Sequence, residues 1–576
     1  MQLPSLPRLL AITLVVVAGQ QIANEALAAG DYGPFHWEIT TTSAEAQRRF
    51  DEGMTWMHAF DHDEAIRSFE AAAKLDEDCA MAWWGVSIAS GPQYNHPVMT
   101  EERTKRAWNA MQEAQKRIDH TTPVERALIE ALRHRNAETE PDTEGRAKLN
   151  QAYADAMGEL WNIHYNDPNI GALYAEARMV LKPWQLYVNG DRTPVEGTEE
   201  IVSTLERVLA LAPNHPGALH LYIHAVEPSQ QPARALFAAD RLGGLVPISG
   251  HLNHMPSHIY VLTGQWEDAI TRNEVAMAAD DRYQESNDVP EVQNGYIIHN
   301  THMLVFAASM CGREKEAMAA ARHMWKDFDD LVDEEPDEID PELAYLDRLM
   351  CCVYDVQKRF GRWQQLIDEE QVPPDGLVVT RAIWHANRAI AYAVLKDFDN
   401  AEEEYQASLA AMDEVPSDYP EIDRVNSLLN VTRHFAAGEI ELQKSLAEEA
   451  KKNPAAAQEH LDLAIESLEK AVEFEDAARY GEPPEPTQPV RHTLGVAYLK
   501  AGRFIDAERV YREDLAEWPN NGWSLKGLSV ALKAQNKTAQ AHEADEQYQA
   551  VWGNPDHPIM SSCLCVEECC SHLMKP

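Results

Sequence analysis

Small and large apolar side chains recur along most of the chain at helical spacing. Ala65, Phe69 and Ala72 share one face of a predicted helix, because offsets of three and four residues return to the same side. A similar order returns far along the chain at Ala507 and Tyr511. Small residues let the two helices of a pair approach each other, and large ones fill the space between successive pairs. The pattern therefore predicts a long series of antiparallel helix pairs.

The same order repeats often enough to define a repeat architecture. Its offsets match the tetratricopeptide repeat, in which each unit of about 34 residues is one helix pair. We expect an all-α fold of the tetratricopeptide α-solenoid type, because stacked pairs build a superhelix with an extended concave surface. An irregular helical bundle is the alternative. Further copies start at Ala107, Ala156, Ile201, Ala269, Ala317, Ala401 and Ala464.

Residues 1–28 have the features of a secretory signal peptide. Arg8 supplies a positive charge, Leu9–Ala18 is an apolar run, and residues 26–28 read Ala-Leu-Ala, an A-x-A cleavage signal. We predict cleavage after Ala28 and export to the periplasm or the extracellular space. An uncleaved anchor is the alternative. No later stretch has the length of a membrane span, so we expect no membrane insertion after cleavage.

The rest of the chain divides by its repeats and composition. We predict N-terminal repeats over 29–190, central histidine-rich repeats over 191–330, C-terminal repeats over 331–552 and a cysteine-rich tail over 553–576. Cysteine pairs near a chain end bind soft metals such as Cu(I) or Zn(II), or form disulfides in an oxidising compartment. Both alternatives stay open for Cys563, Cys565, Cys569 and Cys570.

The charge balance excludes several classes of partner. Asp and Glu number 94 against 50 Lys and Arg, a formal net charge of −44. Such a surface repels nucleic acid and anionic lipid. We therefore expect no nucleic-acid partner, and the surface favours cations or cationic partners.

Seven histidines fall in three short segments of the central repeats. Within a segment they stand three, four or seven residues apart, which places them on one helical face. We expect the first helix of each repeat to line the concave surface, so the three segments should converge in one groove. Glu227 continues the face of the first segment as a further ligand or a base. The candidate metal ligands are His220, His224, His251, His254, His258, His299 and His302.

Imidazole groups in such numbers point to a metal ion. Neutral imidazole is the commonest protein ligand for metals, and zinc takes four ligands, or three with an open position. Copper(II) also favours imidazole, so a divalent transition metal, zinc or copper, is expected. Two alternatives remain: a hydrogen-bonded structural cluster, and a groove whose histidines bind the carboxylate of a partner. Pro256 is expected to kink its helix and re-aim His258.

Four segments resemble a family of exported bacterial tetratricopeptide-repeat proteins. They are Phe60–Trp84, His215–Val226, Gly250–Tyr260 and Gly481–Leu528. The third, GHLNHMPSHIY, is the most specific. The resemblance spans nearly the whole mature chain and implies the α-solenoid fold. It implies no reaction, because the family has no assigned activity, and the cysteine-rich tail is not part of its pattern.

The sequence favours a binding or scaffold protein with a protein or peptide in its concave groove and a metal among its histidines. It carries no H-E-x-x-H, G-x-S-x-G or G-x-x-x-x-G-K motif, the signatures of common enzyme classes. A metal-dependent hydrolase with Glu227 as base is the alternative. Whether the protein is an enzyme is left open by these residues.

Overall fold

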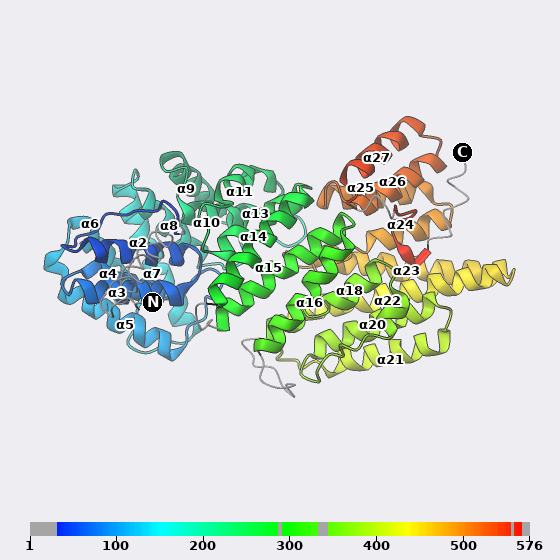
Figure 1. Cartoon of the computed structure of the whole chain (residues 1–576), viewed down its shortest axis with the longest axis horizontal. Helices are drawn as coiled ribbons and strands as arrows, with labels where there is room; N and C mark the ends of the chain where they lie inside the picture. Colours follow the sequence, from blue (N-terminus) through cyan, green and yellow to red (C-terminus); the bar gives the residue numbers. More distant parts are fainter. Residues whose placement is uncertain (1–31, 286–290, 332–343, 486, 554–557, 567–576) are drawn as a thin grey trace, which may run out of the picture.

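The structure is a computed structural model that describes residues 32–285, 291–331, 344–485, 487–553 and 558–566. These residues form α-helices joined by short turns, with three single-turn 3-10 helices, η1 (Ile118–His120), η2 (Pro232–Ala235) and η3 (Leu564–Val566). The described ranges contain no β-strand beyond an isolated bridge between Tyr187 and Pro194. Consecutive helices pack as antiparallel pairs, so the predicted all-α fold of tetratricopeptide-like helix pairs is confirmed (Figure 1).

The N-terminal helices form one end of the elongated molecule (Figure 1). Six of the seven start with a side chain that accepts a hydrogen bond from a free backbone N–H group. The Asp61 carboxylate accepts from the N–H of Glu64, and Thr122 forms a reciprocal capping box with Glu125. The helices are α2 (Ala44–His58), α3 (His62–Leu75), α4 (Ala80–Ala89), α5 (Glu101–Lys116), α6 (Pro123–Arg135), α7 (Thr143–Ile163) and α8 (Pro168–Met179).

The central helices follow, and several of them are short. A proline interrupts what would be one helix, so α12 ends just before α13 begins. The helices are α9 (Thr198–Leu211), α10 (Pro216–Val226), α11 (Leu236–Leu242), α12 (Gly250–His254), α13 (Pro256–Leu262), α14 (Trp266–Gln284), α15 (Glu291–Met310) and α16 (Glu314–Leu331).

The remaining helices form the other end of the molecule (Figure 1). They are α17 (Ala344–Asp347), α18 (Cys352–Arg359), α19 (Trp363–Ile367), α20 (Val378–Val394), α21 (Phe398–Glu414), α22 (Ile422–Ala450), α23 (Pro454–Ala477), α24 (Arg491–Lys500), α25 (Phe504–Glu517), α26 (Gly522–Ala534) and α27 (Thr538–Val551). No helix among the described residues combines the length and the apolar character that a membrane crossing needs.

The repeat packing rests on an aromatic ring held between two glycines. A Cβ added at Gly53 would lie 2.6 Å from the Phe69 ring, and one at Gly85 would lie 2.5 Å from it. Tyr511 is enclosed in the same way by Gly495 and Gly527, with the same sequence spacing as in the first case. The ring comes from the second helix of a pair, and the glycines come from the first helices of that pair and the next. Phe69 and Tyr511 are the large residues of the repeat pattern in the sequence, and glycines of the neighbouring helices make room for their rings.

The C-terminal helices pack back onto the central ones. The Trp523 indole N–H donates to the Ser309 carbonyl at 2.8 Å, and that of Trp266 donates to the Pro519 carbonyl at 3.0 Å. The polar loop between α23 and α24 lies beside the central helices, because Glu482 contacts His258 there. This loop therefore brings a distant part of the sequence to the histidine-rich segments.

Candidate metal centre

Helix α10 positions the first two histidines. His215 caps its N-terminus by accepting from the N–H of Ala218, and Pro216 is its first residue, a position where proline costs no helical hydrogen bond. His220 and His224 lie one turn apart, and both are buried. Glu227 follows at the C-terminal cap with its side chain fully buried. The predicted face of α10 is therefore turned into the protein.

Helices α12 and α13 supply the next three histidines. Gly250 lies so close to the Asp280 carboxylate that a Cβ there would overlap it. Pro256 opens α13 and Met255 joins the two helices, so the predicted kink is confirmed as a break. His251 and His254 lie before the break and His258 after it. All three are buried, with 7%, 0% and 1% of their surface exposed.

Helix α15 carries the last two histidines, and the structure separates them. The His299 ring lies 4.7 Å from that of His254 and 5.6 Å from that of His258, centroid to centroid. His302 instead lines a separate pocket with Arg348, Cys351 and other residues. The structure therefore brings six of the seven histidines together and does not bring His302 to them.

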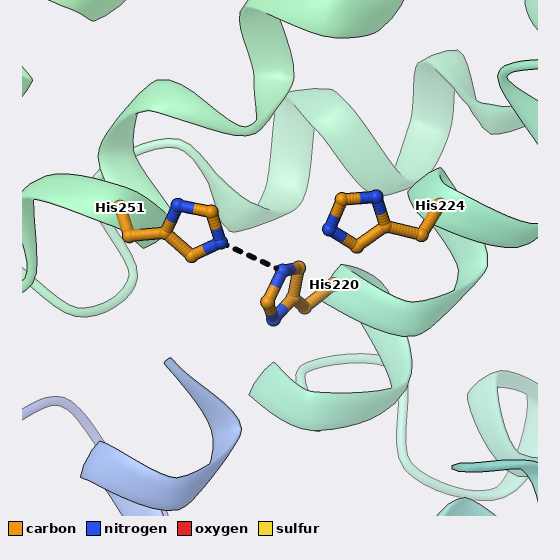
Figure 2. Close-up of side chains that lie close together, drawn as sticks. All are labelled: His220, His224 and His251. Atoms are coloured by element: carbon orange, nitrogen blue, oxygen red, sulfur yellow. Dashed lines mark hydrogen bonds between the residues drawn. The ribbon is translucent and has the colours of Figure 1, made fainter. Parts of the chain in front are cut away.

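The six histidines form two groups of three, each with its potential ligand atoms within 4.8 Å of one another. Figure 2 shows the first group, in which His220 and His224 from α10 face His251 from α12. The Nε2 atoms of His220 and His251 are 3.1 Å apart. We call His220, His224 and His251 the first triad, and His254, His258 and His299 the second triad.

Four of the six rings have a hydrogen bond at Nδ1. His220 Nδ1–H donates to the His58 carbonyl at 2.6 Å, and His224 Nδ1–H donates to Glu227 at 2.8 Å. His254 Nδ1–H donates to the Asn273 side-chain oxygen at 2.6 Å, while the Asn273 amide donates to the Ala269 carbonyl and so fixes that orientation. Acceptors at Nδ1 assign the proton there, which leaves the lone pair on Nε2.

The second triad brings two such lone pairs together. His258 Nδ1–H donates to Glu227 at 2.6 Å and lies 2.7 Å from Glu482. Its Nε2 lies 2.6 Å from the Nε2 of His254. With acceptors facing both Nδ1 atoms, a cation between the two Nε2 atoms, a shared proton or a metal ion, would satisfy both lone pairs. A tetrahedral ion with bonds of about 2.0–2.1 Å needs them about 3.3 Å apart, farther than the 2.6 Å of this structure.

Burial sets the protonation of the cluster. It lowers the pKa of His220, His251, His254 and His299 well below the usual value and that of His224 to about 3. These five are neutral near pH 7 and have lone pairs to donate. Burial also lowers the pKa of His258, but Glu482 and Glu227 outweigh it and raise that pKa to about 10. Without a metal ion, His258 is therefore the protonated ring of the second triad near pH 7.

Aromatic rings enclose the first triad. The Phe60 ring lies 4.3 Å from that of His220, 5.9 Å from that of His224 and 6.0 Å from that of His251. Phe60 has a φ of 62°, a left-handed conformation that is unfavourable for a bulky residue and is often found at functional sites. Trp184 contacts His224 as well, at 5.3 Å. The triad is enclosed, whereas the sequence predicted an open groove.

The sequence did not predict Glu482. It lies in the loop between α23 and α24. Burial, followed by the nearby charge of Glu227, raises the pKa of its carboxyl to about 7. The Tyr480 hydroxyl donates to it at 3.3 Å. Glu227, the predicted ligand or base, has both oxygens bound to Nδ1–H groups of His224 and His258. These contacts favour a role for Glu227 and Glu482 in orienting the rings.

A cavity of about 560 Å³ adjoins the site. Trp184 and Tyr480 line it, and both also contact the site, Trp184 through His224 and Tyr480 through Glu482. Arg424 and Arg479 line it too. The two aromatic residues therefore form the wall between this cavity and the histidines.

The described cysteines of the C-terminal tail do not belong to the histidine triads. Cys563 and Cys565 are joined by a disulfide and are buried beside Glu439. The same two sulfurs and the Glu439 carboxylate lie close enough to share an ion when the disulfide is reduced. Cys569 and Cys570 lie outside the described residues.

Comparisons with known proteins add little to this geometry. No protein-family model matches the chain, and no curated protein matches it. Among solved structures, the human IFIT1 dimer with m7Gppp-AAAA is 12% identical, covers 89% of this chain and 91% of its own, and has a TM-score of 0.29. The Cut9–Hcn1 hetero-tetramer of the APC/C is 13% identical, covers 96% and 81%, and also scores 0.29. TM-scores this low carry no conclusion about this chain.

The helix pairs and the histidines define the chain as an all-α repeat protein with a buried histidine cluster.

Proposed function

We propose that the protein binds a divalent transition metal, zinc or copper, through the two histidine triads. The observation that supports this most directly is the pair of Nε2 atoms of His254 and His258, 2.6 Å apart with both Nδ1 atoms facing acceptors. Metal-bound histidines have this arrangement, in which Nδ1–H is held by a carboxylate, an amide or a carbonyl and Nε2 binds the metal.

A purely structural hydrogen-bonded cluster explains the arrangement less well. Among the described residues, His224 Nε2 and His251 Nδ1 are buried with no hydrogen-bond partner, as are nitrogens of His58, His62 and His302 outside the triads. A buried polar atom without a partner costs about 1–3 kcal/mol. A cluster selected for stability would satisfy these atoms or replace the rings with apolar side chains. A metal ion in the first triad supplies the missing partner for His224 Nε2.

The test is metal titration of the metal-free protein. We expect zinc and copper(II) to bind with similar stoichiometry in calorimetry, and His251→Gln and His254→Gln each to reduce that stoichiometry. Unchanged binding in both variants would show that the assigned ligands are wrong. Retained helical content in circular dichroism excludes unfolding as the cause of any loss.

The wider role that we propose is that of an exported scaffold. The stacked helix pairs support it, because such superhelices use extended surfaces to bind proteins or peptides. Export is supported by the signal-peptide features of residues 1–28, which lie outside the described residues. Detection of the mature chain starting at Ala29 in the periplasm or medium tests export. Cross-linking of the metal-loaded and metal-free forms in that fraction tests whether a protein partner binds.

A further inference from the structure

The two triads lie directly against each other. The ring centroids of His224 and His258 are 5.9 Å apart, and those of His251 and His254 are 6.0 Å apart. In each pair one ring belongs to the first triad and the other to the second. Two ions, one in each triad, would therefore be close neighbours.

The ligands that the two triads offer favour copper. Each triad offers three imidazoles without a carboxylate or thiolate, and imidazole suits copper well. Three ligands leave an open position on each ion. Glu227 is not placed to bridge two ions, because its oxygens accept from Nδ1–H groups on the outer side of the rings. A bridging ligand must therefore come from outside the protein.

The surroundings limit what that ligand can be. Phe60 covers the first triad, Tyr94 and Trp184 pack on His224 at 5.6 and 5.3 Å, and Tyr296 packs on His251 at 4.5 Å. These rings leave little room for a large molecule at the first triad, while His299 of the second triad is only partly buried. The neighbouring cavity reaches the aromatic wall at Trp184. A small, uncharged molecule that diffuses through side-chain fluctuations meets these limits.

We propose that the two triads hold a pair of copper ions that bind dioxygen between them. This inference rests on the proposed metal-binding function. In the binding step each Cu(I) gives one electron to dioxygen, so that two Cu(II) ions and one bridging peroxide form. The O–O bond order falls from two to one, no proton is exchanged and no further reductant is consumed. The reverse step returns both electrons and releases dioxygen.

The test starts with the metal-free mature chain loaded with Cu(I) in the absence of oxygen. Air-saturated buffer is then added. We expect uptake of one dioxygen per copper pair, a charge-transfer absorption band that disappears on deoxygenation, and no EPR signal, because two Cu(II) ions coupled through the bridge have no net spin. The matched variants are His254→Gln, which removes a ligand of the second triad, and His302→Gln, which changes a buried histidine outside both triads.

The outcomes separate this inference from the proposed function. His254→Gln should lose one copper ion and all oxygen uptake. His302→Gln should keep both copper ions and the full oxygen uptake. Two bound coppers with the EPR signal of isolated Cu(II) and no oxygen uptake would overturn the dioxygen site and leave metal binding intact. Failure of both copper and zinc to bind would overturn the proposed function itself. If His254→Gln unfolds, His224→Gln in the first triad gives the same comparison.

Discussion

Glu482 Oε2 lies 2.7 Å from His258 Nδ1, although the two residues are far apart in the sequence. The contact joins the loop that precedes α24 to the first turn of α13. His258 is buried and Glu482 is nearly so, with 1% and 10% of their side chains exposed. The C-terminal repeats therefore complete the histidine site that the central repeats begin.

Replacing Glu482 with Gln should weaken metal binding without removing a ligand. The carboxylate orients His258 and increases the basicity of its Nε2, and loss of such a partner typically lowers metal affinity about 10–100-fold. Competition with a chromophoric chelator measures the change. Glu473→Gln is the control, because Glu473 is exposed and pairs only with Lys470 among the contacts described. Equal affinities for the two variants would contradict the orienting role.

His299 and His302 form a matched pair on one helix. His299 belongs to the second triad, and burial lowers the pKa of His302 to about 4 in a different pocket. His299→Gln should lower the metal content by about one ion per chain, since a triad reduced to two ligands falls below the usual zinc set. His302→Gln should not change it. Mass spectrometry of metals after dialysis gives the stoichiometry. A loss in His302→Gln alone would show that α15 presents its other face to the metal.

Adding one methyl group at Gly85 should destabilise the first repeats. The new Cβ would lie 2.5 Å from the Phe69 ring, and overpacking of this kind costs about 1–3 kcal/mol. Urea unfolding of Gly85→Ala measures the loss. Phe69→Leu makes room, so the double variant Gly85→Ala/Phe69→Leu should be more stable than the sum of the two single effects predicts. Strict additivity would show that the ring and the glycine are not in contact.

Glu439 should make stability depend on pH near neutrality. Burial raises the pKa of its carboxyl to about 7 from the ordinary value of 4.5, although the Thr493 hydroxyl donates to it. Between these values the folded state binds the proton and the unfolded state does not, so the free energy of unfolding falls as pH rises from 4.5 to about 7. The loss is on the order of 1–3 kcal/mol for a shift of this size in a buried group.

Glu439→Gln removes this titration. Unfolding by guanidinium at pH 5 and pH 8 compares it with the unchanged protein. The variant should gain stability relative to the unchanged protein as pH rises between these values. A constant difference between the two proteins at both pH values would contradict a protonated Glu439 in the folded state.

The sequence predicted the parts of the site that follow from helical spacing. His220 and His224 lie on one buried face of α10, and Pro256 breaks the helix that carries His254 and His258. Local rules suffice for these features, because they depend on residues within two turns. The same rules established the helix pairs, since the small and large positions recur with a constant order.

Other parts of the site depend on contacts that no local pattern contains. Glu482 reaches His258 from another repeat, and His220 is held by the backbone carbonyl of His58. Spacing also could not separate His299 from His302, because the neighbouring helices decide what each side of α15 meets. The predicted groove became an enclosed site because Phe60 and Trp184 cover it.

The most direct test of the account is anomalous diffraction from crystals of the full mature chain loaded with copper or zinc. Data collected on either side of the absorption edge of the metal locate the ions without reference to activity. We predict one peak bounded by His220, His224 and His251 and a second bounded by His254, His258 and His299. Peaks absent from both triads, with metal found only elsewhere, for example beside Cys563 and Cys565, would contradict the central claim.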